Sequence, residues 1–214
     1  MSKPKHSDPQ EQQERSYHYG DLRNTLILKG LALLNSRGPE GLSLRELARE
    51  IGVGHNAPYR HFKNKNELLE AMAATGFRQL KAYNLRLELE YANDAEAQLF
   101  ESALYLIQQA SSQNNLFRLM FGGQLSLFDC GEELRSEAQE TLQSLVKIIA
   151  LGQQQGRFSR ENSFRQTLAT LSMIQGFAMM TSSGLLQEIP RDPQQIRAMA
   201  AQVVDVLLKG LNVR

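Results

Sequence analysis

The stretch Ser43 to Lys65, SLRELAREIGVGHNAPYRHFKNK, decides the fold. A serine followed three residues later by a glutamate has the spacing of a capping box, and apolar residues at 44, 47, 48 and 51 then form one face of a short helix that ends at Gly52. A second short segment runs from His55 to Phe62, and because Pro58 has no N–H, this helix should begin near residue 54 or 55, with irregular or 3₁₀ geometry. Two short helices around a glycine turn predict a helix-turn-helix, whose second helix can enter a DNA major groove.

Helical periodicity continues on both sides of this stretch. Apolar residues at 22, 26, 27, 30, 31, 33 and 34 recur at three- and four-residue steps, which predicts an amphipathic helix over about 21–37. Asn64 and Glu67 repeat the capping-box spacing, and further periods predict helices over 65–91, 94–112, 114–121, 131–155, 161–187 and 193–210. Because no strand-like alternation of useful length occurs, the predicted fold class is all-α.

The 214 residues should divide into three parts. Residues 1–16 contain no apolar residue after Met1, so we expect a disordered arm rather than a signal peptide. Residues 17–64 should form a three-helix helix-turn-helix domain, and residues 65–214 a larger helical domain. The uncharged stretch 166–187 is long enough to cross a bilayer, but its Gln, Ser and Thr side chains favour a buried helix instead.

Charge and cysteine usage favour a cytoplasmic protein that can approach nucleic acid. The chain has 24 Lys+Arg against 23 Asp+Glu, yet residues 1–65 hold 11 basic and 7 acidic side chains. This basic bias permits contact with a phosphate backbone, although many solvated surfaces share it. The single cysteine, Cys130, can form no internal disulfide and provides no thiolate cluster, so we expect a reducing compartment and no metal or cofactor.

The sequence carries no motif of an enzyme active site. It lacks histidines at i,i+4 metal spacing, a phosphate-binding Gly-rich loop after a strand, and Gly-x-Ser-x-Gly. Cys130 has no histidine after residue 61 to act as its base. We therefore expect a non-enzyme. Two binding roles remain open, a DNA-binding regulator and an all-helical interaction or small-molecule-sensing protein that does not bind DNA.

Three segments of the chain resemble the TetR family of bacterial one-component transcription regulators. Residues 17–23, YHYGDLR, resemble the start of the first helix in one branch of the family, and residues 43–48 resemble its second helix. Gly52-Val53-Gly54, then residues 57–62 and Lys65, resemble the turn, the recognition helix and the start of the fourth helix. That branch often has Trp-His-Gly in its penultimate helix, where this chain reads Ile174-Gln175-Gly176. The ligand of that branch is therefore not assigned to this chain.

The resemblance implies a ligand-responsive regulator, by family default a repressor, that binds a palindromic operator in double-stranded DNA. Family members contact DNA mainly from their second and third helices. Residues implied to face base edges are Arg45, His55, Asn56 and Ala57, and residues implied to contact phosphates are Ser43, Tyr59, His61 and Lys65. Taken singly, each has an ordinary structural role, such as an N-cap or a packing residue, and only their occurrence in one register favours DNA binding.

The family also implies a homodimer and an effector cavity. The dimer is expected through helices 161–187 and 193–210, with burial inside the monomer as the alternative. Helices between about 65 and 180 would surround an unknown small molecule, with helix 65–91 as the lever to the DNA-binding segment. Candidate lining residues are Phe100, Leu104, Gln108, Phe117, Met120, Phe121, Met173 and Phe177. The amides of Gln108 and Gln175 need hydrogen-bond partners, for which a backbone carbonyl or the second subunit is an alternative to a ligand. No membrane partner is expected, and the protein should be cytoplasmic and nucleoid-associated when bound to DNA.

Overall fold

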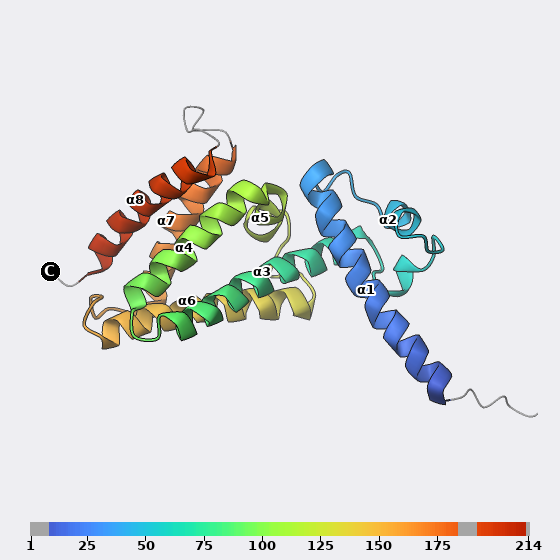
Figure 1. Ribbon diagram of the computed structural model, residues 1–214, viewed down its shortest axis with the longest axis horizontal. Helices are drawn as coiled ribbons and strands as arrows, with labels where there is room; N and C mark the ends of the chain where they lie inside the picture. Colours follow the sequence, from blue (N-terminus) through green and yellow to red (C-terminus); the bar gives the residue numbers. More distant parts are fainter. Residues whose placement is uncertain (1–8, 184–191, 213–214) are drawn as a thin grey trace, which may run out of the picture. The chain divides into compact units, whose positions relative to one another are not determined.

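The computed structural model describes residues 9–183 and 192–212, with side chains from residue 22 onward except Pro193. The elements in chain order are α1 (Pro9–Arg37), α2 (Leu44–Glu50), the 3₁₀ turn η1 (Pro58–Arg60), α3 (Lys65–Glu90), α4 (Ala95–Ser112), α5 (Asn114–Phe121), α6 (Glu132–Gln154), α7 (Ser163–Ser183) and α8 (Pro193–Leu211) (Figure 1). Within the described ranges the only β-type pairing is an isolated bridge between Phe158 and Asn212. The all-α prediction is confirmed. No described helix has the length and apolar character needed to cross a bilayer.

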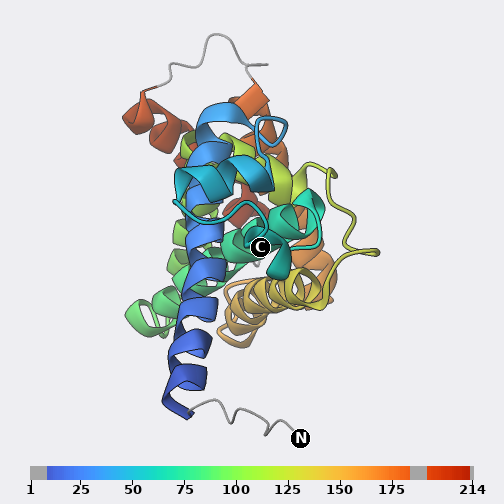
Figure 2. The same ribbon diagram turned by 90° about the vertical axis from the view of Figure 1, so that its right-hand side faces the viewer.

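The chain forms two compact units, one up to Met72 and one from Ala73 onward. In the first unit, α1, α2, η1 and the start of α3 enclose a core in which Leu26, Leu34 and Leu47 are completely buried. Figure 2 shows α2 crossing α1 near the C-terminal end of α1. Three ion pairs link these helices: Lys29 pairs with Glu50 at 3.0 Å, and Arg37 pairs with Glu46 and, at 3.6 Å, with Glu50.

The first helix differs from the sequence prediction. It begins at Pro9 rather than near residue 21, and it therefore includes residues 9–16 of the expected N-terminal arm. Proline is well placed in a first helical turn, and the Gln, Glu and Arg residues that follow are good helix formers with no breaker before Gly20. Residues 1–8 lie outside the described residues.

The segment predicted as a second short helix over 55–62 is shorter than expected. Only Pro58–Arg60 is helical, as a 3₁₀ turn. The backbone N–H of Ala57 donates to Gly54 O at 2.8 Å, and that of Arg60 donates to Ala57 O at 3.2 Å. Because Pro58 has no N–H, the bond that would continue an α-helix back to Gly54 cannot form. The predicted 3₁₀ geometry is confirmed, whereas the predicted helix length is wrong.

In the second unit, α4 packs against α5, α6, α7 and α8. Its buried face includes Leu99, Ala103 and Ile107, which belong to one continuous apolar core. Phe158 is fully buried against Gly152, where a Cβ atom would lie 2.1 Å from the ring, so this position of α6 accepts only glycine in the observed packing. The predicted helices 65–91, 94–112, 114–121, 131–155 and 193–210 agree with the structure to within one residue at most ends. The predicted end of helix 161–187 lies outside the described residues.

Candidate functional site

The residues that begin α2 form an exposed helix start. Ser43 is the N-cap, with φ −145° and ψ 140°, and its Oγ accepts a hydrogen bond from the Glu46 N–H at 3.1 Å. The predicted capping box is half formed, because the Glu46 carboxylate pairs with Arg37 on α1. Ser43 and Arg45 are both exposed to solvent.

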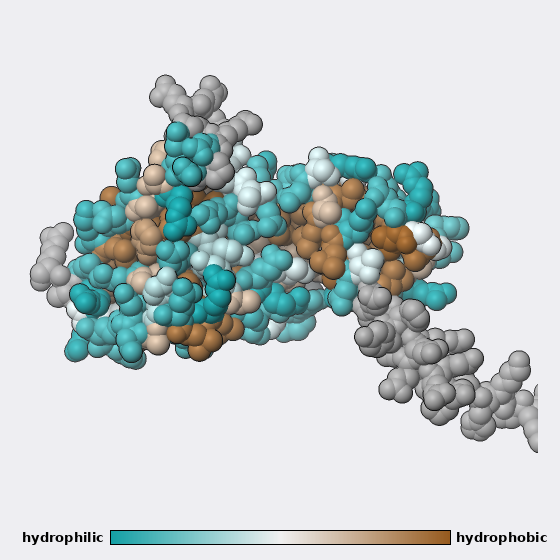
Figure 3. Space-filling view, in the orientation of Figure 1, coloured by the Kyte–Doolittle hydropathy of each residue, from teal (hydrophilic) through white to brown (hydrophobic). Residues whose placement is uncertain are grey.

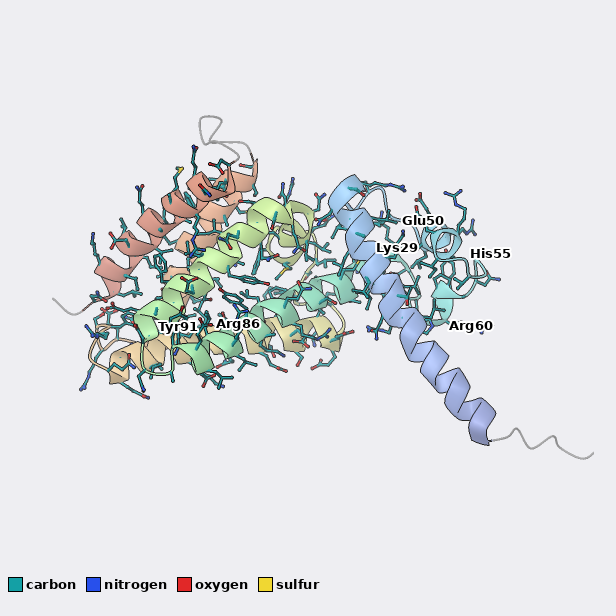
Figure 4. All side chains as sticks on the ribbon, viewed as in Figure 1. Lys29, Glu50, His55, Arg60, Arg86 and Tyr91 are labelled. Atoms are coloured by element: carbon teal, nitrogen blue, oxygen red, sulfur yellow. The ribbon has the colours of Figure 1, made fainter. Side chains whose placement is uncertain are left out.

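The turn and η1 present a second row of exposed side chains. Gly52 has φ +76°, a conformation that favours glycine, and it redirects the chain after α2. Pro58 and Phe62 are buried and anchor the segment, while His55, Asn56 and Tyr59 are exposed, Tyr59 by 44%. The labelled side chains His55 and Arg60 both project outward from this segment (Figure 4). The buried side chains therefore fix the backbone of this segment, and its polar side chains remain exposed.

Three further predicted residues are half-buried, namely Ala57, His61 and Lys65. Burial lowers the pKa of His61, and the positive charges of Arg23 and Arg60 lower it further, so the imidazole is neutral at pH 7. Lys65 is the first residue of α3, and its Nζ lies 3.4 Å from the carbonyl oxygen of Glu40.

The exposed residues differ from their neighbours in having unused hydrogen-bonding groups. Within the described part of the chain, no ion pair or side-chain hydrogen bond is made by Arg45, His55, Asn56 or Tyr59. By contrast, the acidic residues of α2 pair with Lys29 and Arg37, and Figure 4 shows Lys29 and Glu50 near each other on α1 and α2. The unpaired groups are those that a bound partner would satisfy.

Two exposed basic residues beside the predicted set were missed. Arg60 is exposed on η1, and the side chain of Lys63 is 88% exposed, 3.6 Å from a Glu67 carboxylate oxygen. Four basic or imidazole side chains between residues 60 and 65 were the available signal. Arg60 and Lys63 add positive charge next to the predicted residues.

The second unit contains a cavity of about 200 Å³. It lies among α3, α4, α5, α6, α7 and the loop between α5 and α6, which Figure 2 shows in yellow-green extending from the helices. Its lining residues are Phe77, Leu80, Asn84, Ser102, Ala103, Leu106, Met120, Phe121, Leu127, Ala138, Thr141, Leu142, Leu145, Leu171, Ile174 and Gln175.

Two of the eight predicted lining residues, Met120 and Phe121, line this cavity. The other six do not, which are Phe100, Leu104, Gln108, Phe117, Met173 and Phe177. The reason is helical phase, because the face of α4 that meets the cavity carries residues 102, 103 and 106, and residues 100, 104 and 108 lie on a different face. Leu104, Phe117 and Phe177 are core residues, and Met173 is 36% exposed.

A polar chain crosses one wall of the cavity. Ser102 Oγ donates to Asn84 Oδ1 at 2.8 Å, and Asn84 Nδ2 donates to Ser144 Oγ at 2.8 Å. The Thr141 hydroxyl lies 3.0 Å from the carbonyl oxygen of Phe77, which belongs to α3. These bonds tie α3 to α4 and α6 and satisfy the polar groups that they use.

Beside the cavity, charged residues join α3 to α6. Lys81 Nζ lies 2.7 Å from a carboxylate oxygen of Glu137 and 2.7 Å from one of Glu140, and Arg78 Nε lies 2.8 Å from Glu137. Burial alone would raise the pKa of Glu137, but the hydrogen bonds from Lys81 and Arg78 outweigh it and the pKa is lowered. The same bonds raise the pKa of Lys81. The network is therefore fully ionised near neutral pH.

This architecture defines an all-helical helix-turn-helix protein with a separate cavity-containing helical unit. A family model described as "Bacterial regulatory proteins, tetR family" matches residues 26–72. The chain is 50% identical over 50 residues to the class A tetracycline repressor protein from transposon 1721 of Escherichia coli, which is 23% of each protein. It is 29% identical to the Escherichia coli class D tetracycline repressor protein over 160 residues, 73% of this chain and 63% of that one. These matches span from about a quarter to under two thirds of the relatives' lengths.

Solved structures agree over more of the chain. A protein of unknown function from Rhodococcus sp. RHA1 is 29% identical with a TM-score of 0.76, covering 92% of this chain and 98% of that one. A regulatory protein in the tetR family from Rhodococcus RHA1 has a TM-score of 0.63 at 19% identity, covering 90% and 97%. Residues 26–72 thus match the TetR family, and the fold of the chain is similar to that of solved TetR-family regulators.

Proposed function

We propose that this protein is a ligand-responsive transcription regulator, acting as a repressor, that binds a palindromic operator as a homodimer. The observation that carries this proposal is the set of exposed side chains with unused hydrogen-bonding groups on α2 and η1, led by Arg45, His55, Asn56 and Tyr59. A helix-turn-helix places this part of its surface against a major groove. Enzymatic activity and a metal or cofactor form no part of the proposal.

The chemistry of each group suggests its role. The Arg45 guanidinium can donate two bonds to guanine O6 and N7, Asn56 can pair with adenine N6 and N7, and the methyl group of Ala57 can pack against thymine. His55 directly precedes Asn56 in the sequence, and we assign it to the base edges as well. Hydroxyl and cationic groups suit phosphate oxygens, which we assign to Tyr59 and to the residues Ser43, His61 and Lys65. A neutral His61 would serve as an N–H donor rather than as a cation.

Dimerisation would supply a second recognition segment, since one short segment reads too few base pairs to select a site in a genome. The exposed side of α7 combines the apolar residues Leu168, Met173 and Met180 with Gly176, where an added Cβ would meet nothing within 4 Å. On α8, Val206 is 60% exposed, and Figure 3 shows hydrophobic residues reaching the surface along this helix. These faces are the proposed dimer interface, of which the predicted residues 184–187 lie outside the described part.

The cavity of the second unit is the proposed effector site. A structural neighbour, RolR, was solved in complex with resorcinol and has a TM-score of 0.64 at 17% identity, a likeness of fold alone. Tetracycline, which appears in the names of the curated relatives, is not proposed for this chain, because the matches at about 50% identity span only about 50 residues. The site is cytoplasmic in this proposal, and DNA-bound protein would be nucleoid-associated.

Selection of bound fragments from genomic DNA by the full-length protein tests the proposal. We expect a small set of fragments sharing a two-fold symmetric motif, bound with an affinity that falls steeply as salt rises. A helical sensing protein that does not bind DNA is the second reading, and it predicts no fragment enriched over input at any salt concentration.

A further inference from the structure

We propose that the cavity binds an uncharged, mainly apolar compound of one or two rings, with a single hydrogen-bonding group directed at Gln175. This inference rests on the effector role proposed above and names the chemical class of the effector. Three properties of the cavity support the inference: the charge of its lining, the hydrogen bonding of its lining, and its volume.

The first property is the absence of charge. Of the lining residues, all of which are described, twelve are apolar and none is acidic or basic. The nearby ionic groups Arg78, Lys81 and Glu137 pair with one another across α3 and α6 and are not part of the lining. Because an unpaired charge is costly to bury, this lining selects against carboxylates and amines.

The second property is the position of one unused amide. Asn84, Ser102 and Thr141 bond to protein groups, so their main hydrogen-bonding capacity is already used. Gln175 is half-buried on α7 and has no hydrogen-bond partner within the described residues. Its side chain offers two N–H donors and one carbonyl acceptor. A ligand hydroxyl, ring N–H or carbonyl would satisfy this amide.

The third property is size. A cavity of about 150 Å³ lined by Leu, Ile and Phe is sufficient for benzene in another protein. The cavity here has about 200 Å³ and a similar lining, with the rings of Phe77 and Phe121 on its wall. This volume corresponds to one ring with substituents or to two fused rings.

Calorimetric titration of the full-length protein with small probes tests the inference. Indole is neutral, has two fused rings and one N–H donor, whereas indene has the same shape without the donor and benzoate carries a charge. We expect indole to bind more tightly than indene, and benzoate to show no binding at the same concentration. Gln175→Leu should weaken indole binding about tenfold and leave indene binding unchanged, the effect of one lost hydrogen bond.

Two controls keep the outcomes separate. Ala138→Phe fills the cavity and should abolish binding of both neutral probes, and circular dichroism with the dimer mass by light scattering checks that each variant is folded. Benzoate binding as tight as indole binding, an unchanged indole affinity in Gln175→Leu, or no binding of any neutral probe would overturn the inference. Binding to the selected genomic DNA fragments is measured on the same samples. DNA binding without probe binding rejects only this inference. Probe binding without DNA binding rejects the proposed regulator function instead.

Discussion

Basic side chains of the first unit fall into two groups with different tasks. Lys29 and Arg37 are held by Glu50 and Glu46, and these pairs join α1 to α2. Bonding to Lys29 also lowers the pKa of Glu50, so the pair stays ionised at neutral pH. Arg45 on the same α2 has no ionic partner within the described residues. Residues of the first group maintain the scaffold, whereas Arg45 remains available to a binding partner, which we propose to be DNA.

The roles assigned to two residues lead to a first prediction. Asn56→Ala should change the preference among operator variants, because it removes a base-edge contact worth about 1–3 kcal/mol at one position. Tyr59→Phe should instead weaken binding to all sequences by a similar factor, because it removes a phosphate contact. Gel-shift titrations on a set of single-base operator variants make the comparison. The reverse pattern would show that the two assignments are exchanged.

At the scale of elements, α3 carries features of both units. It begins at Lys65 beside the DNA-binding segment, and further along it contributes Phe77, Leu80 and Asn84 to the cavity wall. Its charged side chains are fixed to α6 by Glu137. A ligand in the cavity would therefore contact α3 directly, which supports the proposed role of this helix as the lever.

The link between α3 and α6 gives a second prediction, which concerns stability. The lowered pKa of Glu137 means that its contribution is present above its unfolded pKa, near 4.5, and is lost as the pH falls through the folded value. Glu137→Gln should lower the free energy of unfolding by about 1–2 kcal/mol at pH 7. The difference from wild type should shrink towards zero as the pH falls below about 4.5.

Urea denaturation at several pH values measures this difference. Glu132→Gln is the matched control, since Glu132 lies on the same helix, is 85% exposed and is 3.5 Å from Arg135. It should have little effect at any pH. Equal losses in the two variants, or a loss in Glu137→Gln that does not depend on pH, would contradict the ionic account.

Element boundaries were predictable where local signals act alone. Capping residues such as Asp94, which accepts from the Ala97 N–H at 3.0 Å, mark helix starts directly in the sequence. The start of α1 was missed because the residues before 21 favour a helix but include few apolar side chains that would mark one. The shortness of η1 was missed because the hydrogen bond that Pro58 removes ends the helix earlier than the apolar spacing indicates. The candidates for DNA contact came from local motifs, and the structure places them at the start of α2 and on the segment from residue 55 to the first residue of α3.

The cavity could not be predicted in the same way. Periodicity shows which residues share a helix face, but which neighbour that face meets depends on tertiary packing. From the sequence alone, Phe100 and Leu104 are therefore candidates as good as Ala103 and Leu106. Only Ala103 and Leu106 line the cavity. The hydrogen-bonded chain through Asn84 joins residues far apart in sequence and leaves no local signal.

At the scale of the whole molecule, the proposed function requires two copies of the chain. Gly176→Arg tests this requirement as a third prediction, since the glycine lies on the exposed side of α7 and a larger residue meets open space in the monomer. The variant should remain helical but become monomeric at micromolar concentration, with operator affinity reduced at least a hundredfold. Sedimentation velocity and gel shifts measure the two effects.

Gly176→Ala is the matched control, because it removes the same glycine with a much smaller side chain. It should stay dimeric and gain up to about 1 kcal/mol of helix stability. A dimeric Gly176→Arg, or a monomeric variant that binds the operator as tightly as wild type, would contradict the proposed interface.

Operator binding by the exposed side chains of α2 and η1 is tested by the salt dependence of binding to the most enriched genomic fragment, compared between wild type and Arg45→Ala. We expect nanomolar binding by wild type near physiological salt, with the logarithm of the affinity falling linearly with the logarithm of the salt concentration. Arg45→Ala should bind that fragment at least tenfold more weakly and discriminate less between it and random DNA. Binding by wild type that is weak, independent of salt and equal on random DNA would show that the exposed face of α2 and η1 does not read an operator.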